Sequence, residues 1–214
     1  MNKNIFWKAS MVCLLSLGFV ACQQQESETL FNGETLDGWE HVGDGDFKVE
    51  DGLLKTEGGM GLLWYTPAMF ENVKIKVVYK GASENNAGVF IRIPERPTEP
   101  WMPVYRGYEV QIDDREDEYH RTGALYSLTK VKASPGIPNE WNTMEITLDG
   151  DRTVVTVNGV LVTDYKEGDP VPLKKLDYEP DRGLRPNKGY IGLQNHGGDD
   201  VIYFKEVTIT ALKK

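Results

Sequence analysis

Apolar and polar residues alternate along many short segments of this 214-residue chain, and no long segment shows helical periodicity. In residues 73–79 (VKIKVVY), valine and isoleucine alternate with Lys74 and Lys76, which predicts a strand whose lysines face solvent. In residues 153–163, Asn158-Gly159 separates two runs rich in β-branched residues. Both turn residues tolerate positive φ, so this pattern predicts a hairpin. Similar patterns predict strands at residues 47–50, 53–56, 61–65, 87–93, 107–113, 123–127, 141–148, 189–195 and 201–211.

About a dozen short strands without intervening helices predict an all-β, antiparallel β-sandwich that forms a single domain. Two segments, residues 94–106 and 166–188, are rich in proline and charge and do not fit the strand pattern. Long loops on a rigid sandwich often carry binding groups. We therefore expect these two loops to border any functional site.

The first 21 residues have the pattern of a secretory signal peptide. Lys3 and Lys8 precede an uncharged apolar run at residues 9–20, which is too short to span a bilayer as a permanent helix. Residues 17–22 (LGFVAC) resemble the lipobox of bacterial lipoproteins, which predicts lipidation of Cys22. Residues 22–29 would then be a tether that holds the domain, residues 30–214, to a membrane of the cell envelope, on the periplasmic side or at the cell surface. Ordinary cleavage near Ala21, with a soluble product, is the alternative.

The charge of the chain argues against nucleic acid as a partner. The formal net charge is -9, and removal of residues 1–21 takes away two lysines and no acid, which makes it -11. Such a chain cannot neutralise a row of phosphates. Cys13 lies in the signal and Cys22 would be lipidated, so the domain has no thiol for disulfides, iron–sulfur clusters or cysteine catalysis.

Several predicted strands share an unusual outer face. In residues 107–113 (GYEVQID), Tyr108, Val110 and Ile112 lie on one face, while two carboxylates and an amide lie on the other. If the strands at 87–93, 107–113, 123–127 and 189–195 belong to one sheet, their shared polar face collects Arg92, Glu109, Gln111, Asp113, Gln194 and His196 with the aromatic residues Phe90, Tyr126 and Tyr190. Planar donors and acceptors beside aromatic rings are typical of sugar-binding sites. The alternative is a solvated outer face.

Other chemistries lack their motifs. The chain has no Gly-x-Ser-x-Gly elbow, no phosphate-binding glycine loop and no His-Glu-x-x-His pattern. Its histidines, at positions 41, 120 and 196, are too scattered to argue for a zinc site. The acidic run at residues 113–118 is either a calcium-binding segment or, as is more usual, a solvated loop.

Six blocks of the sequence occur in the order seen in one known family. They are LFNGETLDGWE, NNAGVFIRI, GYEVQIDD, TGALY, EWNTMEITLDG and GYIGLQNHG. The similarity as a whole covers the chain from Leu30 to about Leu212. The chain resembles the 3-keto-disaccharide hydrolase domain family. The resemblance implies a concanavalin A-like, laminarinase-type jelly-roll sandwich and cleavage of glycosides that carry a ketone at C3.

The chemistry that this resemblance implies needs a base, a stabiliser of the enolate and an acid. A C3 ketone acidifies the C2 proton, so a base can remove it, the enolate can expel the group at C1, and water can then add. The candidate roles are Glu109 or His196 as base, Arg92 as enolate stabiliser and Asp113 as acid or positioning group. The candidate substrate-binding residues are Gln111, Gln194, Tyr126, Tyr190 and Phe90. In a variant of this scheme, a divalent cation polarises the ketone in place of Arg92.

Two other functions fit the same predicted sandwich. A laminarinase-type glycosidase needs a Glu-x-Asp-x-x-Glu pattern, but reading from Glu109 gives Gln111 and Asp114 in place of its second and third carboxylates. A non-catalytic carbohydrate-binding lipoprotein module needs no such pattern.

Overall fold

The computed structural model describes residues 26–115 and 117–213. The predicted signal peptide, the lipidation site Cys22 and the first residues of the tether lie outside the described residues. No helix in the described part is long and apolar enough to cross a membrane.

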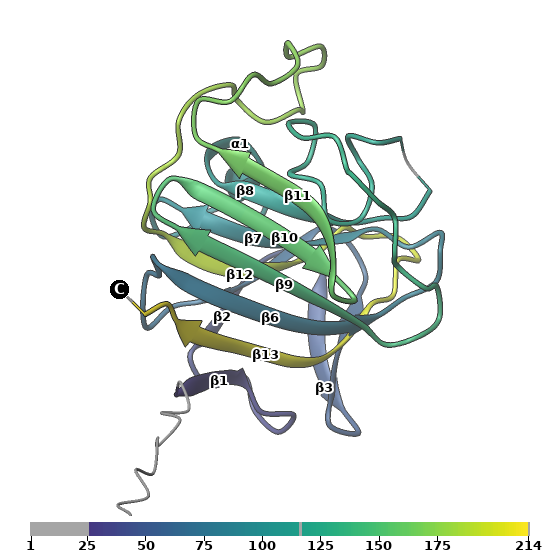
Figure 1. Ribbon diagram of the computed structural model, residues 1–214. Coiled ribbons are helices and arrows are strands. Elements are labelled where there is room, and N and C mark those ends of the chain that lie inside the picture. Colours follow the sequence, from purple (N-terminus) through teal and green to yellow (C-terminus); the bar gives the residue numbers. More distant parts are fainter. Residues whose placement is uncertain (1–25, 116, 214) are drawn as a thin grey trace, which may run out of the picture.

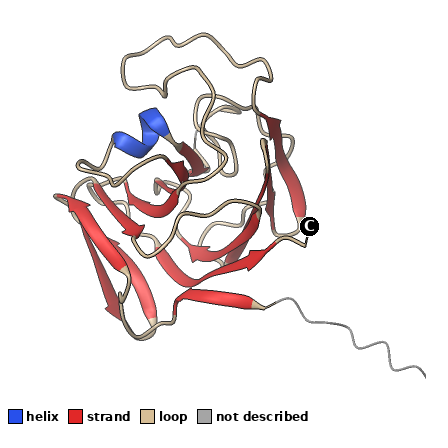
Figure 2. Cartoon of the chain, turned by 90° about the vertical axis from the view of Figure 1, so that its left-hand side faces the viewer, coloured by secondary structure: helices blue, strands red, loops and turns tan. Residues whose placement is uncertain are grey.

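Two antiparallel sheets pack face to face, as Figures 1 and 2 show. The eight-stranded sheet contains β1 (Ser27–Phe31), β3 (Asp46–Glu50), β4 (Leu53–Glu57), β6 (Val73–Lys80), β9 (Asn142–Asp149), β10 (Arg152–Val157), β11 (Val160–Lys166) and β13 (Tyr203–Ala211). The five-stranded sheet contains β2 (Trp39–Gly43), β5 (Gly61–Tyr65), β7 (Ala87–Ile93), β8 (Tyr108–Ile112) and β12 (Tyr190–Asn195). The single described helix, α1 (Met102–Arg106), precedes β8.

The strand orders join segments that are distant in sequence. The eight-stranded sheet runs β11-β10-β9-β6-β13-β4-β3, with β1 paired to β13, and the five-stranded sheet runs β2-β5-β12-β7-β8. The prediction of an all-β antiparallel sandwich is therefore confirmed.

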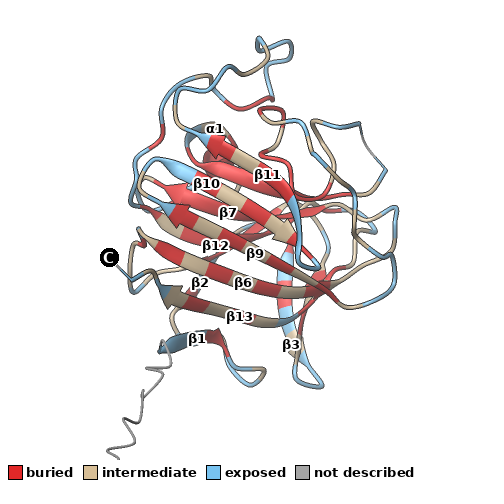
Figure 3. Ribbon diagram, in the orientation of Figure 1, coloured by how far each residue is buried: buried red, intermediate tan, exposed pale blue. Residues whose placement is uncertain are grey.

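Side chains alternate between core and solvent as the sequence predicts. In β6, Ile75 and Val77 are fully buried in the core between the sheets, while Lys74 and Lys76 point outward and pair with glutamates of neighbouring strands. The strands of Figure 3 accordingly show buried and less buried positions in turn. The predicted hairpin is β10–β11, whose turn residues Asn158 and Gly159 have φ of +50° and +77°.

Four segments differ from the prediction. Ser27, Glu28 and Thr29 pair with β13, so part of the expected tether belongs to the sheet. The strands β1 and β2 and the helix α1 were not predicted. Residues 123–127 form no regular strand, because Gly123 and Ser127 have positive φ. An isolated bridge at Leu125 and single backbone hydrogen bonds, such as that from the Gly123 N–H to the Gln111 carbonyl at 2.9 Å, still join this segment to β8.

The predicted position of Arg92 on the polar outer face is wrong. Strand β7 has a bulge there: Tyr190 pairs with Ile93 and Gly192 with Phe90, so two residues of β7 face one residue of β12. Arg92 has φ of +54°, which reverses the alternation of side chains from this point. Its side chain therefore leaves the outer face, and Ile93 takes the outward position.

The Arg92 side chain is fully buried and connects two loops to β7. Its Nη2 donates to the carbonyl of Gly150 at 2.8 Å, and its Nη1 donates to the carbonyl of Pro186 at 3.0 Å and to Asn187 Oδ1 at 3.3 Å. Gly150 belongs to the turn before β10, and Pro186 ends the long loop before β12. Arg92 is thus a structural residue that fixes these connections.

Substitution Arg92→Met should lower the free energy of unfolding by about 3 kcal/mol, because buried carbonyl groups lose a charged donor. Urea unfolding followed by tryptophan fluorescence measures this loss. Arg106→Met is the matched control, since Arg106 pairs with Glu95 at the surface and should contribute less than about 1 kcal/mol. Equal stability of the Arg92 variant and the wild type would contradict the buried role.

Candidate active site

One half of the outer face of the five-stranded sheet is covered by an apolar cluster. The segment containing α1 lies over it, and the cluster consists of Leu62, Trp64, Phe90, Ile93, Met102 and Val104. Phe90 is fully buried in this cluster, and Tyr190 packs edge-on against Trp64 with ring centroids 4.9 Å apart. The predicted sugar contact of Phe90 is wrong, because the covering loop occupies that surface. Tyr190 does not line the pocket described next, and its role in sugar binding stays a prediction.

The other half of this face forms a polar pocket of about 150 Å³, here called the inner pocket. It is lined by Asn86, Trp101, Val104, Glu109, Gln111, Tyr126, Tyr178, Gln194 and His196. The structure therefore brings together five of the predicted site residues: Glu109, Gln111, Tyr126, Gln194 and His196. Trp101 and Tyr178 come from the two proline-rich loops that were expected to border the site.

Glu109 lies at the floor of the inner pocket, over Gly88 of the neighbouring strand. A Cβ at position 88 would lie 2.7 Å from Glu109 Cγ, so only glycine leaves room for this side chain. Glu109 is 5% exposed, and burial, with a smaller effect from the charge of Asp113, raises its pKa to about 8. A hydrogen bond with Gln194 lowers the pKa in part. Near neutral pH, Glu109 is therefore a neutral carboxylic acid that can donate a hydrogen bond.

Two amide oxygens in the inner pocket lack hydrogen-bond partners in the described structure. Gln111 Oε1 and Gln194 Oε1 are both buried and unpaired, while Gln111 Nε2 donates to Asn86 Oδ1 at 3.1 Å. A buried acceptor without a partner is costly, and a ligand hydroxyl would satisfy it. The arrangement suits a polyhydroxylated ligand.

His196 is oriented by Asp200. His196 Nδ1 lies 3.2 Å from Asp200 Oδ2, and Asp200 Oδ1 accepts from the backbone N–H of Asn86 at 3.0 Å. When Nδ1 donates to this carboxylate, Nε2 of the neutral ring is the free acceptor. Asp200 thus holds both the His196 imidazole and Asn86 at the edge of the inner pocket.

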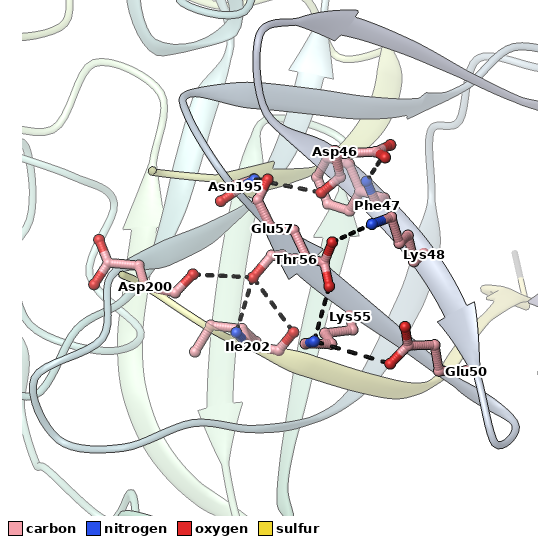
Figure 4. Close-up of polar contacts among 10 residues, drawn as sticks. All are labelled: Asp46, Phe47, Lys48, Glu50, Lys55, Thr56, Glu57, Asn195, Asp200 and Ile202. Carbon is pink, nitrogen blue, oxygen red and sulfur yellow. Dashed lines mark hydrogen bonds and ion pairs between the residues drawn. The ribbon is translucent and has the colours of Figure 1, made fainter. Parts of the chain in front are cut away.

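The loop that carries Asp200 is fixed by β4, as Figure 4 shows. Thr56 Oγ1 donates to the Asp200 carbonyl at 3.2 Å and accepts from the Ile202 N–H at 2.9 Å. Asn195, next to His196, donates to the carbonyl of Glu57 at 2.7 Å. The imidazole is therefore positioned by strands of both sheets.

Asp113 does not line the inner pocket, so its predicted role as an acid is not supported. Its carboxylate accepts from Arg115, with the backbone N–H at 2.9 Å and Nη2 also at 2.9 Å. The turn after β8 brings Arg115 back over Asp113. Asp113 contributes to the site through its charge, which raises the pKa of Glu109.

The groove continues outward from the inner pocket. Its next part, here called the middle pocket, is lined by Asn86, Gln111, Arg115, His120, Tyr126, Leu176, Tyr178, Glu179 and His196. His120 lies against Tyr126, with ring centroids 5.2 Å apart. The backbone places Tyr126 beside the floor, because its N–H donates to the carbonyl of Glu109 at 2.9 Å.

The pocket residues do not fit the divalent cation that the family resemblance allows. Within residues 26–115 and 117–213, no three His, Cys, Asp or Glu side chains come together in the way that metal ligands do. We therefore derive no step through a metal ion.

Comparison with known proteins gives one matching family and several similar solved structures. The chain is similar to two crystal structures of candidate glycosyl hydrolases from Parabacteroides distasonis. One is 24% identical, with a TM-score of 0.72, covering 87% of this chain and 94% of that chain. The other is 25% identical, with a TM-score of 0.69, covering 87% and 100%.

A more distant structural likeness is to the carbohydrate-binding module CBM66 from Bacillus subtilis, at 15% identity and a TM-score of 0.57, covering 81% of this chain and 96% of that chain. A comparison with curated proteins gave no match. The model of the 3-keto-alpha-glucoside-1,2-lyase-like domain matches residues 26–210, so the chain belongs to this family.

Proposed function

We propose that this protein is a carbohydrate-active enzyme that cleaves 3-keto-glycosides by elimination across C1 and C2 of the sugar. Membership of a lyase-like family and the similarity to candidate glycosyl hydrolases support carbohydrate chemistry. The observation that carries the finer proposal is the pairing, in one pocket, of a neutral Glu109 with the His196–Asp200 pair. These groups match the needs of an enolate mechanism.

In this proposal His196 acts as the base. Its Nε2 takes the proton from C2, and the electrons of the C2–H bond pass toward the C3 carbonyl oxygen, which becomes an enolate. The enolate then re-forms the ketone, a C1=C2 double bond forms and the C1–O bond breaks. The proton on His196 passes to the departing oxygen, so atoms and charge balance. Water that adds across the double bond completes net hydrolysis.

Glu109 supplies the hydrogen bond that stabilises the enolate oxygen. This role replaces the one first assigned to Arg92, whose guanidinium is bonded to backbone carbonyl groups away from the pocket. A neutral acid in a buried site is a strong donor to a developing oxyanion and needs little reorganisation. Gln111 and Gln194 would accept hydrogen bonds from sugar hydroxyls.

The inner pocket does not favour double-carboxylate hydrolysis of an unoxidised glycoside. Glu109 is the one carboxyl group among the described residues that line it. In the middle pocket, Glu179 is paired with Arg182 at 2.7 Å. Ordinary glycosidases need two free carboxyl groups that flank the scissile bond.

The proposal predicts release of the alcohol from a 3-keto-glucoside and none from the unoxidised parent, measured on the purified domain from residue 26. His196→Asn should lower kcat by at least about 10²-fold, because the base is lost. His41→Asn is the matched control, since His41 lies on β2 and lines neither pocket. Release from the parent alone would refute the elimination, and binding without release from either compound would favour a carbohydrate-binding module.

The role of Glu109 as donor rather than base gives a separate prediction. Glu109→Ala should lower kcat by about 10²–10³-fold, whereas Glu109→Gln, which keeps an N–H donor, should retain more activity. The wild-type rate should fall about tenfold per pH unit once the pH exceeds the Glu109 pKa of about 8. The Gln variant should lack this alkaline decline in kcat. A completely inactive Gln variant together with an active Ala variant, or a rate that rises through pH 8, would contradict the donor role.

A further inference from the structure

A third cavity lies at the outer end of the groove, on the long loop between β11 and β12 that rises at the top of Figure 1. This outer pocket has a volume of about 390 Å³. Pro172, Leu173 and Leu176 supply its apolar lining, and its other lining residues are polar, charged or aromatic. It shares His120, Leu176 and Glu179 with the middle pocket. The outer pocket is therefore continuous with the proposed reaction site.

Exposed apolar side chains are concentrated on this loop. Eight large apolar side chains are exposed in the described part of the chain, and four of them are Leu173, Leu176, Tyr178 and Leu184. Leu173 is 85% exposed and Leu176 is 47% exposed, and Figure 3 shows most of this loop in the colour of exposed residues. Single exposed apolar residues are ordinary, but a cluster beside a site marks a binding surface.

Hydrogen bonds hold the apolar residues in place. Arg182 Nε donates to the carbonyl of Pro172 at 2.8 Å, and Arg182 Nη2 donates to Glu179 Oε2 at 2.7 Å and to the carbonyl of Ser127 at 3.3 Å. These bonds close the loop on itself and join it to the segment that follows β8. The apolar surface is thus formed before any ligand arrives, which lowers the entropic cost of binding.

The carboxylates around the outer pocket already have partners. Glu179 is paired with Arg182, and Asp117 Oδ1 lies 2.9 Å from His120 Nδ1. A second sugar ring would present hydroxyl groups that need polar partners, whereas Leu173, Leu176 and Pro172 offer mainly carbon atoms. The chemistry of the outer pocket therefore differs from that of the inner pocket, where two amide oxygens have no hydrogen-bond donor among the described residues.

We propose that the outer pocket binds the apolar part of a leaving group, while the inner pocket holds the oxidised sugar. This inference rests on the proposed function and names its substrate class: 3-keto-glycosides of alcohols that carry a large apolar group, such as a benzyl group. The leaving oxygen would lie between the two pockets, in the middle pocket, where His196 can return its proton.

The test compares benzyl and methyl 3-keto-glucosides of the anomer that the enzyme cleaves, because the two leaving alcohols have nearly equal acidity and differ in apolar surface. The wild type should show a KM at least about tenfold lower for the benzyl compound. The double substitution Leu173→Ser and Leu176→Ser should remove most of this difference. Leu173→Ser alone, at a residue that lines the outer pocket and neither of the other two, should remove part of it and leave the methyl compound unchanged. Leu184→Ser is the matched control, since Leu184 is exposed on the same loop but lines none of the three pockets.

Calorimetric binding of the unoxidised benzyl and methyl glucosides separates this inference from the proposed reaction. A benzyl preference that the double substitution removes, without turnover of any 3-keto compound, would support the outer pocket and refute the elimination. Turnover with equal KM values for both compounds would refute the outer pocket alone. The outer pocket would also be refuted if the double variant kept the benzyl preference and lost binding only to lipid vesicles or to another protein.

Discussion

The bulge at Arg92 determines which side chains reach each face of the five-stranded sheet. Before it, β7 alternates regularly, with Val89 and Ile91 in the core between the sheets and Phe90 on the outer face. After it, Ile93 joins the outer apolar cluster, while the Arg92 guanidinium bonds to the turn before β10 and to the end of the long loop. One reversed residue thus adds Ile93 to the covered half of the outer face and fixes one end of the loop that borders the groove.

The groove changes from a polar floor to an apolar outer end, because its parts come from different elements. Strands β8 and β12 supply Glu109, Gln111 and Gln194, whose positions follow from the pleat of a rigid sheet. The loops supply Trp101 and the apolar residues of the outer pocket. Arginines bonded to backbone carbonyls hold the long loop: Arg182 closes its middle, and Arg185 Nε donates to the carbonyl of Gly107 at 2.8 Å. The polar floor and the apolar outer end are therefore both formed before ligand binding.

The sequence predicts the sandwich, the hairpin at Asn158-Gly159 and the common location of Glu109, Gln111, Gln194 and His196, because the side-chain period of a strand is fixed at two. It does not predict the bulge, since residues 89–93 are an unbroken β-rich run with no glycine at Arg92 to mark a change of backbone conformation. Nor does it show that Phe90 is covered, because the cover depends on how the loop with α1 folds back.

Side chains outside regular strands are harder to place from sequence. Asp113 is the next alternate position after Gln111, but it lies just beyond the end of β8. In the turn that follows, Arg115 donates hydrogen bonds to the Asp113 carboxylate. Asp200 and Tyr178 carry no periodic signal, and tertiary contacts such as the bond between Asp200 and Asn86 bring them to the site. The proline-rich composition indicated which loops border the groove, but not which of their residues face it.

The central claim is that a neutral Glu109 lies at the floor of the site and polarises the substrate ketone. Infrared difference spectroscopy of the carboxylic C=O band, comparing the wild type with Glu109→Gln across a pH series, measures this protonation directly. The account predicts a band that is present at pH 7, is absent from the variant and titrates with a pKa of about 8. A Glu109 carboxyl that is already ionised at pH 6, near the ordinary glutamate range, would contradict it.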